Sequence, residues 1–144
     1  MDDQAEDSAF VLDFILRQNL AVLTTINHNG LPESSVTGFG QTNLLELIFG
    51  ADVRSRKYQN LRTNPAVAVV IGWGPDNVTV QIEGEALELA DNNSKFIAEN
   101  YWTKHPEAEK YYINPGQRYF LVKPKWIRYT DLSKEPWKVI VLDY

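Results

Sequence analysis

The chain has 144 residues, enough for one domain with a hydrophobic core. Lys and Arg number 14 and Asp and Glu number 19, so the formal charge is −5, which excludes the basic surface that a generic duplex nucleic-acid binder needs. The chain has no cysteine, which excludes a disulfide framework, a thiolate metal site and a Cys nucleophile.

The apolar runs and the N-terminus indicate where the protein resides. The apolar runs, such as residues 66–71, are too short to span a bilayer. The N-terminus is acidic at Asp2 and Asp3, whereas a signal peptide begins with basic residues. We therefore expect a cytoplasmic protein with no membrane or nucleic-acid partner. We expect a single domain over residues 1–144, in which residues 1–7 fray.

The N-terminal part predicts a helix followed by a meander of strands. Ser8 is a typical N-cap residue, and apolar side chains follow it at helical spacing, which predicts a helix over residues 9–19. The spacing then changes to that of strands, and Asn29-Gly30 supplies the positive φ angles that a tight hairpin needs. Strands are predicted over residues 20–26, 31–39 and 44–49, with turns at 27–30 and 40–43.

The central part predicts a short helix between strands. The helix covers residues 54–62, with Asp52 or Ser55 as its N-cap, and ends at Asn64-Pro65 because proline removes a backbone donor. Gly84 lies inside a predicted strand and indicates a bulge or a close approach of the backbone. The two strands of this part are predicted over residues 66–73 and 78–89.

The C-terminal part predicts helix and then strand. A helix is expected over residues 91–110, in two pieces broken at Pro106. Pro124 lies inside the next predicted strand and favours an edge position or a bulge there. The last strands are predicted over residues 119–129 and 137–142. About six antiparallel strands with inserted helices predict a mainly β fold, closed or nearly closed into a small barrel.

The basic residues between Arg17 and Lys95 form one cluster, around the start of the short central helix. The cluster consists of Arg54, Arg56, Lys57 and Arg62. A helix N-terminus offers free N–H groups and the positive end of the helix dipole, so cations placed there favour a phosphate. A solvated helix face with ordinary surface charges is the alternative interpretation.

The residues around this cluster resemble a known family. Residues 49–57, Phe-Gly-Ala-Asp-Val-Arg-Ser-Arg-Lys, resemble the FMN phosphate segment of the pyridoxamine 5′-phosphate oxidase-like flavoproteins, in which Ser-Arg-Lys opens a helix that ends in Asn-Pro. Residues 30–37 resemble the strand that lies against the flavin ring in that family. The resemblance covers residues 20–89. It implies a six-stranded antiparallel split β-barrel of Greek-key topology, the FMN-binding split barrel.

The resemblance also implies a cofactor site. Three residues at the helix start bind the FMN phosphate, namely Ser55, Arg56 and Lys57. Two small residues of the preceding strand contact the flavin or its ribityl chain through backbone groups, namely Gly50 and Ala51. Three residues of an earlier strand line the edge of the isoalloxazine ring, namely Ser35, Val36 and Thr37. No catalytic residue and no metal ligand is assigned.

The family resemblance implies a homodimer with FMN at the interface and a flavin-dependent oxidoreductase that acts on a small molecule or a nicotinamide donor. The true oxidase has Arg, Lys and Gln where this chain has Ser35, Gly40 and Thr79, and it has a C-terminal histidine that is missing here. The chain therefore resembles a short relative without the clamp for the substrate phosphate. A non-catalytic flavin or haem protein and an F420-dependent reductase remain alternatives.

The two histidines and two of the tryptophans are secondary candidates for the site. His28 lies in a predicted turn and His105 beside Pro106, and both are interpreted as exposed loop residues rather than ligands. Trp126 and Trp137 lie in C-terminal strands, which approach the partner's cofactor in the family. Either is a candidate to stack on a flavin.

Overall fold

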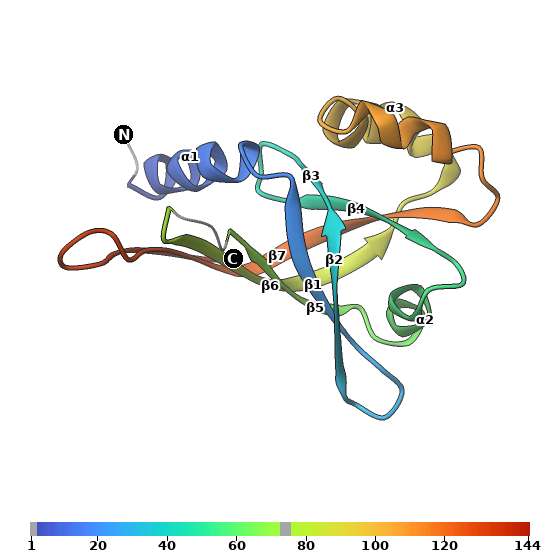
Figure 1. The fold of residues 1–144 in the computed structure, drawn as a ribbon, viewed down its shortest axis with the longest axis horizontal. Helices are drawn as coiled ribbons and strands as arrows, with labels where there is room; N and C mark the ends of the chain where they lie inside the picture. The colour runs from blue at the N-terminus through green and yellow to red at the C-terminus, as the bar shows by residue number, and fades with distance from the viewer. Residues whose placement is uncertain (1–2, 73–75) are drawn as a thin grey trace.

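The computed structural model describes residues 3–72 and 76–144 (Figure 1). Its strands are β1 (Leu20–Ile26), β2 (Pro32–Gly38), β3 (Gly40–Gln41), β4 (Leu47–Asp52), β5 (Ala66–Ile71), β6 (Val78–Glu88), β7 (Gln117–Asp131) and β8 (Lys138–Asp143). Its α-helices are α1 (Asp3–Leu16), α2 (Arg56–Thr63) and α3 (Ser94–Ile97), with 3-10 turns η1 (Asp91–Asn93) and η3 (Pro106–Tyr111) and a π turn η2 (Ala98–Trp102). The predicted strand end at residue 73 and part of the predicted turn after it lie outside the described residues.

The strands form one antiparallel sheet in the order β2-β1-β5-β6-β7-β4-β3, and β8 pairs with β7. Because β2 also contacts β4, the sheet curls back towards itself as a half-barrel (Figure 1). This confirms the predicted mainly β split-barrel fold. Within the described residues the sheet has more strands than the six expected of the barrel. The C-terminal β8 matches the strand predicted over residues 137–142, whereas the two-residue β3 lies in the predicted turn at 40–43.

The β1–β2 hairpin follows its sequence pattern closely. In β1 the buried residues alternate with half-buried ones, and β1 has the predicted bounds. The carboxamide of Asn27 accepts the backbone N–H groups of Asn29 and Leu31, and Gly30 adopts a φ of 78°. The turn chemistry of Asn and Gly therefore sets the register of this hairpin, in which Ile26 faces Pro32.

The strand predicted over residues 44–49 is displaced towards the C-terminus. Thr42 closes a tight turn, in which its hydroxyl accepts the N–H groups of Leu44 and Glu46. Leu45 takes a left-handed φ of 63° while its side chain is buried in the core. The turn therefore uses two leucines that resemble strand residues by composition, and β4 begins only at Leu47.

Two helical predictions need correction. The first helix begins at Asp3 rather than at residue 9, since the acidic Asp3 and Glu6 stabilise its first turn through the helix dipole. Residues 3–7, which were expected to fray, are therefore helical. In the segment predicted as two helices over 91–110, only α3 is α-helical. It continues as a π turn, in which Thr103 N–H donates to Ala98 O at 3.0 Å, and the predicted break at Pro106 separates it from η3.

The core lies inside the half-barrel, and a smaller second cluster lies outside it. The large core joins α1 to the inward residues of the strands. The second cluster packs η2 and α3 against the outer side of β4 and β7, through Ile48, Trp102 and Tyr119. Both faces of β4 are therefore covered, which explains its continuous apolar run. This packing holds β4 and the α2 turn that follows it in a fixed place.

Candidate functional site

The start of α2 is built as an anion-binding turn. Ser55 is the N-cap residue, as one of the two predicted alternatives, and its hydroxyl donates to Asp52 O at 2.7 Å and accepts the N–H of Tyr58 at 3.3 Å. Among the described residues, the backbone N–H groups of Arg56 and Lys57 have no acceptor. Two free N–H groups therefore point out of the first turn, at the positive end of the helix dipole.

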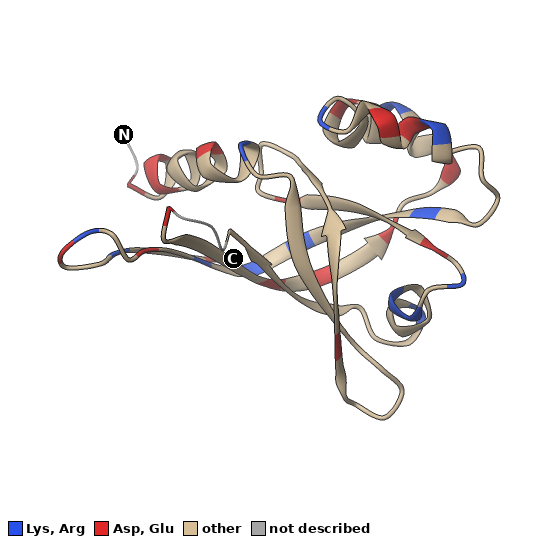
Figure 2. Cartoon of the chain, viewed as in Figure 1, with Lys and Arg blue, Asp and Glu red and all other residues tan. Residues whose placement is uncertain are grey.

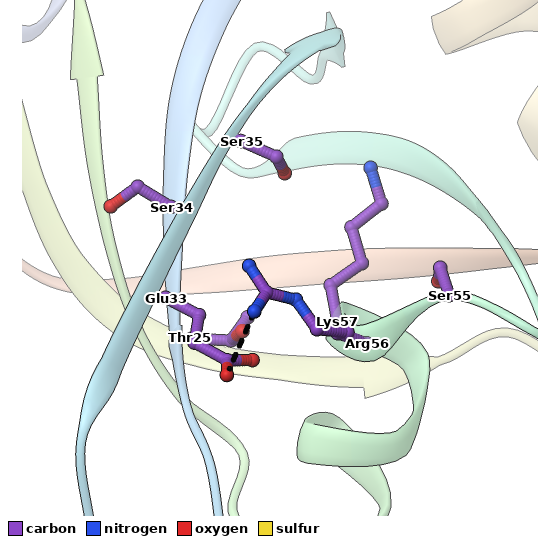
Figure 3. A pocket seen from close by; sticks show the side chains of 7 residues that line it. All are labelled: Thr25, Glu33, Ser34, Ser35, Ser55, Arg56 and Lys57. Carbon is purple, nitrogen blue, oxygen red and sulfur yellow. Dashed lines mark ion pairs between the residues drawn. The ribbon is translucent and has the colours of Figure 1, made fainter.

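A cavity of about 210 Å³ opens between this turn and the β1–β2 hairpin. Its lining consists of Thr25, Glu33, Ser34, Ser35, Ser55, Arg56 and Lys57. Figure 3 shows Lys57 extending along the cavity towards Ser35, while Arg56 reaches across towards Glu33. The structure therefore brings four of the predicted site residues to one cavity, namely Ser35, Ser55, Arg56 and Lys57.

The cations of the basic cluster differ in how they are paired. Figure 2 shows Lys and Arg gathered on α2 and the turn before it. Arg54 pairs with Asp52 at 2.9 Å outside the cavity and lowers the pKa of that carboxyl to about 2. Arg56 pairs with Glu33 at 3.3 Å. In the described part of the chain Lys57 makes no ion pair, and burial lowers the pKa of its ammonium group. An anion in the cavity would offset that cost of burial.

Glu33 is a site residue that the sequence analysis missed. Its carboxylate accepts hydrogen bonds from Asn60 at 2.9 Å and from Asn27 at 3.2 Å. These contacts hold the pKa of Glu33 below its usual value. The hydrogen bond from Asn60 has the largest effect, followed by that from Asn27, and the charge of Arg56 adds to them while burial opposes them. Glu33 shares a strand face with Ser35, a periodicity that was visible in the sequence. Its contact with α2 was not visible, because it depends on how that helix docks.

Four predicted site residues lie away from the cavity lining. Val36 points to the opposite face of β2 from Ser35 and is 60% exposed. Thr37 donates its hydroxyl to the Gly38 carbonyl. A Cβ at Gly50 would displace the end of the flexible Gln117 side chain, and Ala51 is buried in the core. Neither residue is among those that line the cavity.

The two histidines occupy different surroundings. His28 is exposed in the β1–β2 turn, as expected. His105 is not an exposed loop residue, since its side chain is only 12% exposed and its Nε2 lies 2.8 Å from the Phe39 carbonyl oxygen. Its Nδ1 lies 3.6 Å from a Glu107 carboxylate oxygen. His105 therefore ties η3 to the segment before β3.

The outer face of the sheet is partly apolar. One row of directly paired residues crosses six strands and consists of Val36, Val22, Val70, Gln81, Arg128 and Val141. Both ends of the row are exposed, Val36 at 60% and Val141 at 47%. Val139, on the same face of β8, is 43% exposed. Across residues 3–72 and 76–144, no helix has the length and apolar character needed to cross a bilayer.

Solved structures share this fold at low sequence identity. A protein of the pyridoxinephosphate oxidase family related to general stress protein 26, from Clostridium acetobutylicum, matches with a TM-score of 0.75, 13% identity and coverage of 99% of this chain and 96% of that one. A haem-binding protein from Mycobacterium smegmatis matches with a TM-score of 0.76 and 14% identity, over 99% of this chain and 59% of that one. HutZ, the haem storage protein from Vibrio cholerae, matches with a TM-score of 0.70 and 16% identity, over 81% and 88%.

Comparison of the sequence with models of known protein families identifies the family of this chain. The model for pyridoxamine 5′-phosphate oxidase matches residues 8–131, which include every strand from β1 to β7 together with α2. The matched part contains the whole cavity lining. The chain belongs to the pyridoxamine 5′-phosphate oxidase family.

Proposed function

We propose that this chain is an FMN-binding flavoprotein that holds the FMN phosphate at the start of α2. The observation that carries this proposal is the cavity beside that helix. Its lining includes Lys57, whose ammonium group has no ion pair among the described residues, and the first turn of α2 with its two free backbone N–H groups. Together they offer a fixed positive region that lacks a full complement of negative charge. Family membership supports flavin as the carrier of that phosphate.

The residues of the cavity take distinct roles in this proposal. Lys57 and the N–H groups of the first turn bind phosphate oxygens, and Arg56 turns from Glu33 to the ligand. Ser55 acts by shaping the turn, because its hydroxyl proton is already donated to Asp52 O. Ser35 is exposed at the opposite wall and supplies a hydroxyl to the flavin side. Bound FMN supplies hydride or electron transfer, and the chain acts as an oxidoreductase on a small molecule or a nicotinamide donor.

We further propose that the protein is a homodimer with the cofactor at the interface. The cavity of about 210 Å³ is smaller than the roughly 300 to 1,000 Å³ of typical ligand pockets, so one chain encloses only part of FMN. The exposed apolar ends of the outer-face row, Val36 and Val141, supply a surface for a second copy. Val36 would then lie in the interface, on the opposite face of β2 from the cavity.

The test is the spectrum of the purified protein together with flavin affinities of two matched variants. We expect the flavin absorption bands, and we expect Lys57→Ala to weaken FMN binding by about tenfold or more while riboflavin binding changes little. Arg54→Ala is the control, since Arg54 pairs with Asp52 outside the cavity. Equal FMN affinities of wild type and Lys57→Ala would contradict the proposed phosphate site.

Haem is the second candidate, because two structural neighbours are a haem-binding and a haem storage protein. Under this alternative the purified protein shows a Soret band, and exposed His28 is the available imidazole, since both ring nitrogens of His105 face other groups. An F420-dependent reductase would purify without flavin bands and would bind added F420. A non-catalytic flavin protein would bind FMN but would resist anaerobic reduction by NADH or NADPH.

A further inference from the structure

A fixed carboxylate lies inside the cavity that we assign to a phosphate. The Glu33 side chain is 19% exposed, and two amides, from Asn60 and Asn27, donate to it. Asn60 is itself buried, and it also donates to the buried Thr25 hydroxyl at 2.9 Å. The position of the Glu33 carboxylate is therefore fixed by these two amides, with Asn60 on one carboxylate oxygen and Asn27 on the oxygen that also pairs with Arg56.

Arg56 is the mobile member of its ion pair. Its side chain is 75% exposed, and Glu33 is its ion-pair partner among the described residues. Exposed ion pairs of this kind contribute little to stability, so Arg56 exchanges partners at small cost. Glu33 does not follow it, because its two amide donors hold it against the β1–β2 turn and α2. A bound phosphate that recruits Arg56 therefore leaves an ionised Glu33 close by.

The charge of the cavity follows from these three residues. Arg56 and Lys57 contribute two positive charges and Glu33 one negative charge, so the lining has a net charge of +1. Repulsion by Glu33 grows in proportion to the charge of the ligand. The repulsion therefore weakens the binding free energy of a doubly charged phosphomonoester by twice as much as that of a singly charged phosphodiester.

We propose that Glu33 is a specificity-determining residue, which reduces the advantage of a doubly charged phosphate over a singly charged one in this cavity. The inference rests on the proposed phosphate site and adds to it the rule by which ligands are selected. Removing the Glu33 charge tightens binding in proportion to ligand charge. It leaves binding of the flavin ring unchanged.

A purely structural role of Glu33 makes a different prediction. Glu33→Gln keeps the size of the side chain and an oxygen that accepts from Asn60, while it removes the charge. If Glu33 served only to hold the hairpin to α2, this variant would change the affinities of all flavins by the same factor. A dependence on ligand charge separates the two roles.

The experiment compares three ligands that share one ring system. Riboflavin carries no phosphate charge, riboflavin 4′,5′-cyclic phosphate carries one and FMN carries about two at pH 8. Dissociation constants are measured by quenching of flavin fluorescence for wild type, Glu33→Gln and Asp52→Asn. Asp52→Asn is the matched control, because it removes one carboxylate charge from an ion pair beside the same helix but outside the cavity.

The expected result follows from Coulomb's law at roughly 6 Å in a solvated site. Glu33→Gln leaves the affinity for riboflavin unchanged, raises the affinity for the cyclic phosphate by about threefold and raises that for FMN by about tenfold. Asp52→Asn changes each of the three affinities by less than about twofold, because the Asp52 charge lies outside the cavity and is screened by solvent and salt. Glu33→Ala is the second variant if Glu33→Gln unfolds, with the same expected order of effects.

Three outcomes count against the inference. Equal factors for the three ligands in Glu33→Gln overturn the charge rule and leave the phosphate site intact. Weaker FMN binding in Glu33→Gln also overturns it, since Glu33 would then assist binding by orienting Arg56. If wild type binds none of the three flavins, the proposed function fails and the inference fails with it.

Discussion

Asn60 shows how one buried residue joins two parts of the site. Its amide donates both to the Thr25 hydroxyl, which is 1% exposed, and to the Glu33 carboxylate. We expect Asn60→Ala to lower the free energy of unfolding by about 2 kcal/mol, because it leaves the Thr25 hydroxyl buried without its partner. Urea unfolding measures this free energy. The control Arg62→Ala, at an exposed position of the same helix, should stay within about 0.5 kcal/mol of wild type. Equal stabilities of the two variants would contradict the prediction.

Lys104 predicts a pH dependence of stability. Its ammonium group donates to Gln41 at 2.6 Å and to the Ile15 carbonyl at 3.3 Å, and burial lowers its pKa from 10.5 to about 8. Between those values the unfolded chain binds more protons than the folded one, so stability rises with pH in this window. We expect wild type to gain stability relative to Lys104→Met from pH 8 to pH 10.

The comparison with Lys104→Met isolates this group. Burial raises the pKa of the buried tyrosines, to about 12 for Tyr101. Their titration lowers the stability of the protein only above pH 10, and it does so equally in wild type and in Lys104→Met. Urea unfolding at pH 8, 9 and 10 gives the difference in unfolding free energy at each pH. A difference that does not change with pH would show that Lys104 keeps its ordinary pKa in the fold.

At the scale of the element, the β6–β7 pair depends on one bulge. The register shifts between Glu83 and Gly84, so that Lys125 of β7 has no residue directly opposite it on β6, although its side chain pairs with Glu85. A Cβ at Gly84 would meet the Lys123 carbonyl oxygen. The predicted close approach at Gly84 is therefore confirmed, and Pro124 marks the bulge rather than an edge, since β7 pairs with β6, β4 and β8.

Substitution of that glycine tests the bulge. We expect Gly84→Ala to lower the free energy of unfolding by about 2 kcal/mol, since the added methyl group forces the backbones of β6 and β7 apart. Gly116→Ala is the control, because the nearest atom to its Cβ is 3.4 Å away, on the Asp52 side chain. Its unfolding free energy should change by less than about 0.5 kcal/mol. Thermal unfolding of both variants and of wild type gives these free energies. Equal losses in the two variants would show that the backbones of β6 and β7 make only an ordinary contact at Gly84.

At the scale of the whole molecule, the proposed homodimer makes the outer face of the sheet the interface. Light scattering should give twice the chain mass of 16.5 kDa. We expect Val141→Glu to shift this mass to that of one chain and to weaken FMN binding, because burying a charge in an apolar part of an interface is strongly unfavourable. Ile113→Glu is the control, since Ile113 is 88% exposed in the segment before β7. A monomeric wild type that binds FMN fully would contradict the interface.

Features that depend on neighbouring residues were predictable from the sequence. The bounds of β1 and the end of α2 at Asn64-Pro65 follow from periodicity and backbone sterics, and Ser55 was one of the two residues predicted to cap that helix. The concentration of cations at the start of α2 was visible for the same reason. These effects act between residues that are close in the sequence, so no knowledge of the fold is needed to predict them.

Which of those charges is available to a ligand depends on how distant segments pack. Glu33 reaches Arg56 because the β1–β2 hairpin docks beside α2, whereas Lys57 has no ion pair in the part of the chain that the structure describes. Strand register turns Val36 away from Ser35, and Ala51 faces the buried core instead of the cavity. These placements depend on pairing and docking between segments far apart in the chain, and local sequence patterns do not encode those distances.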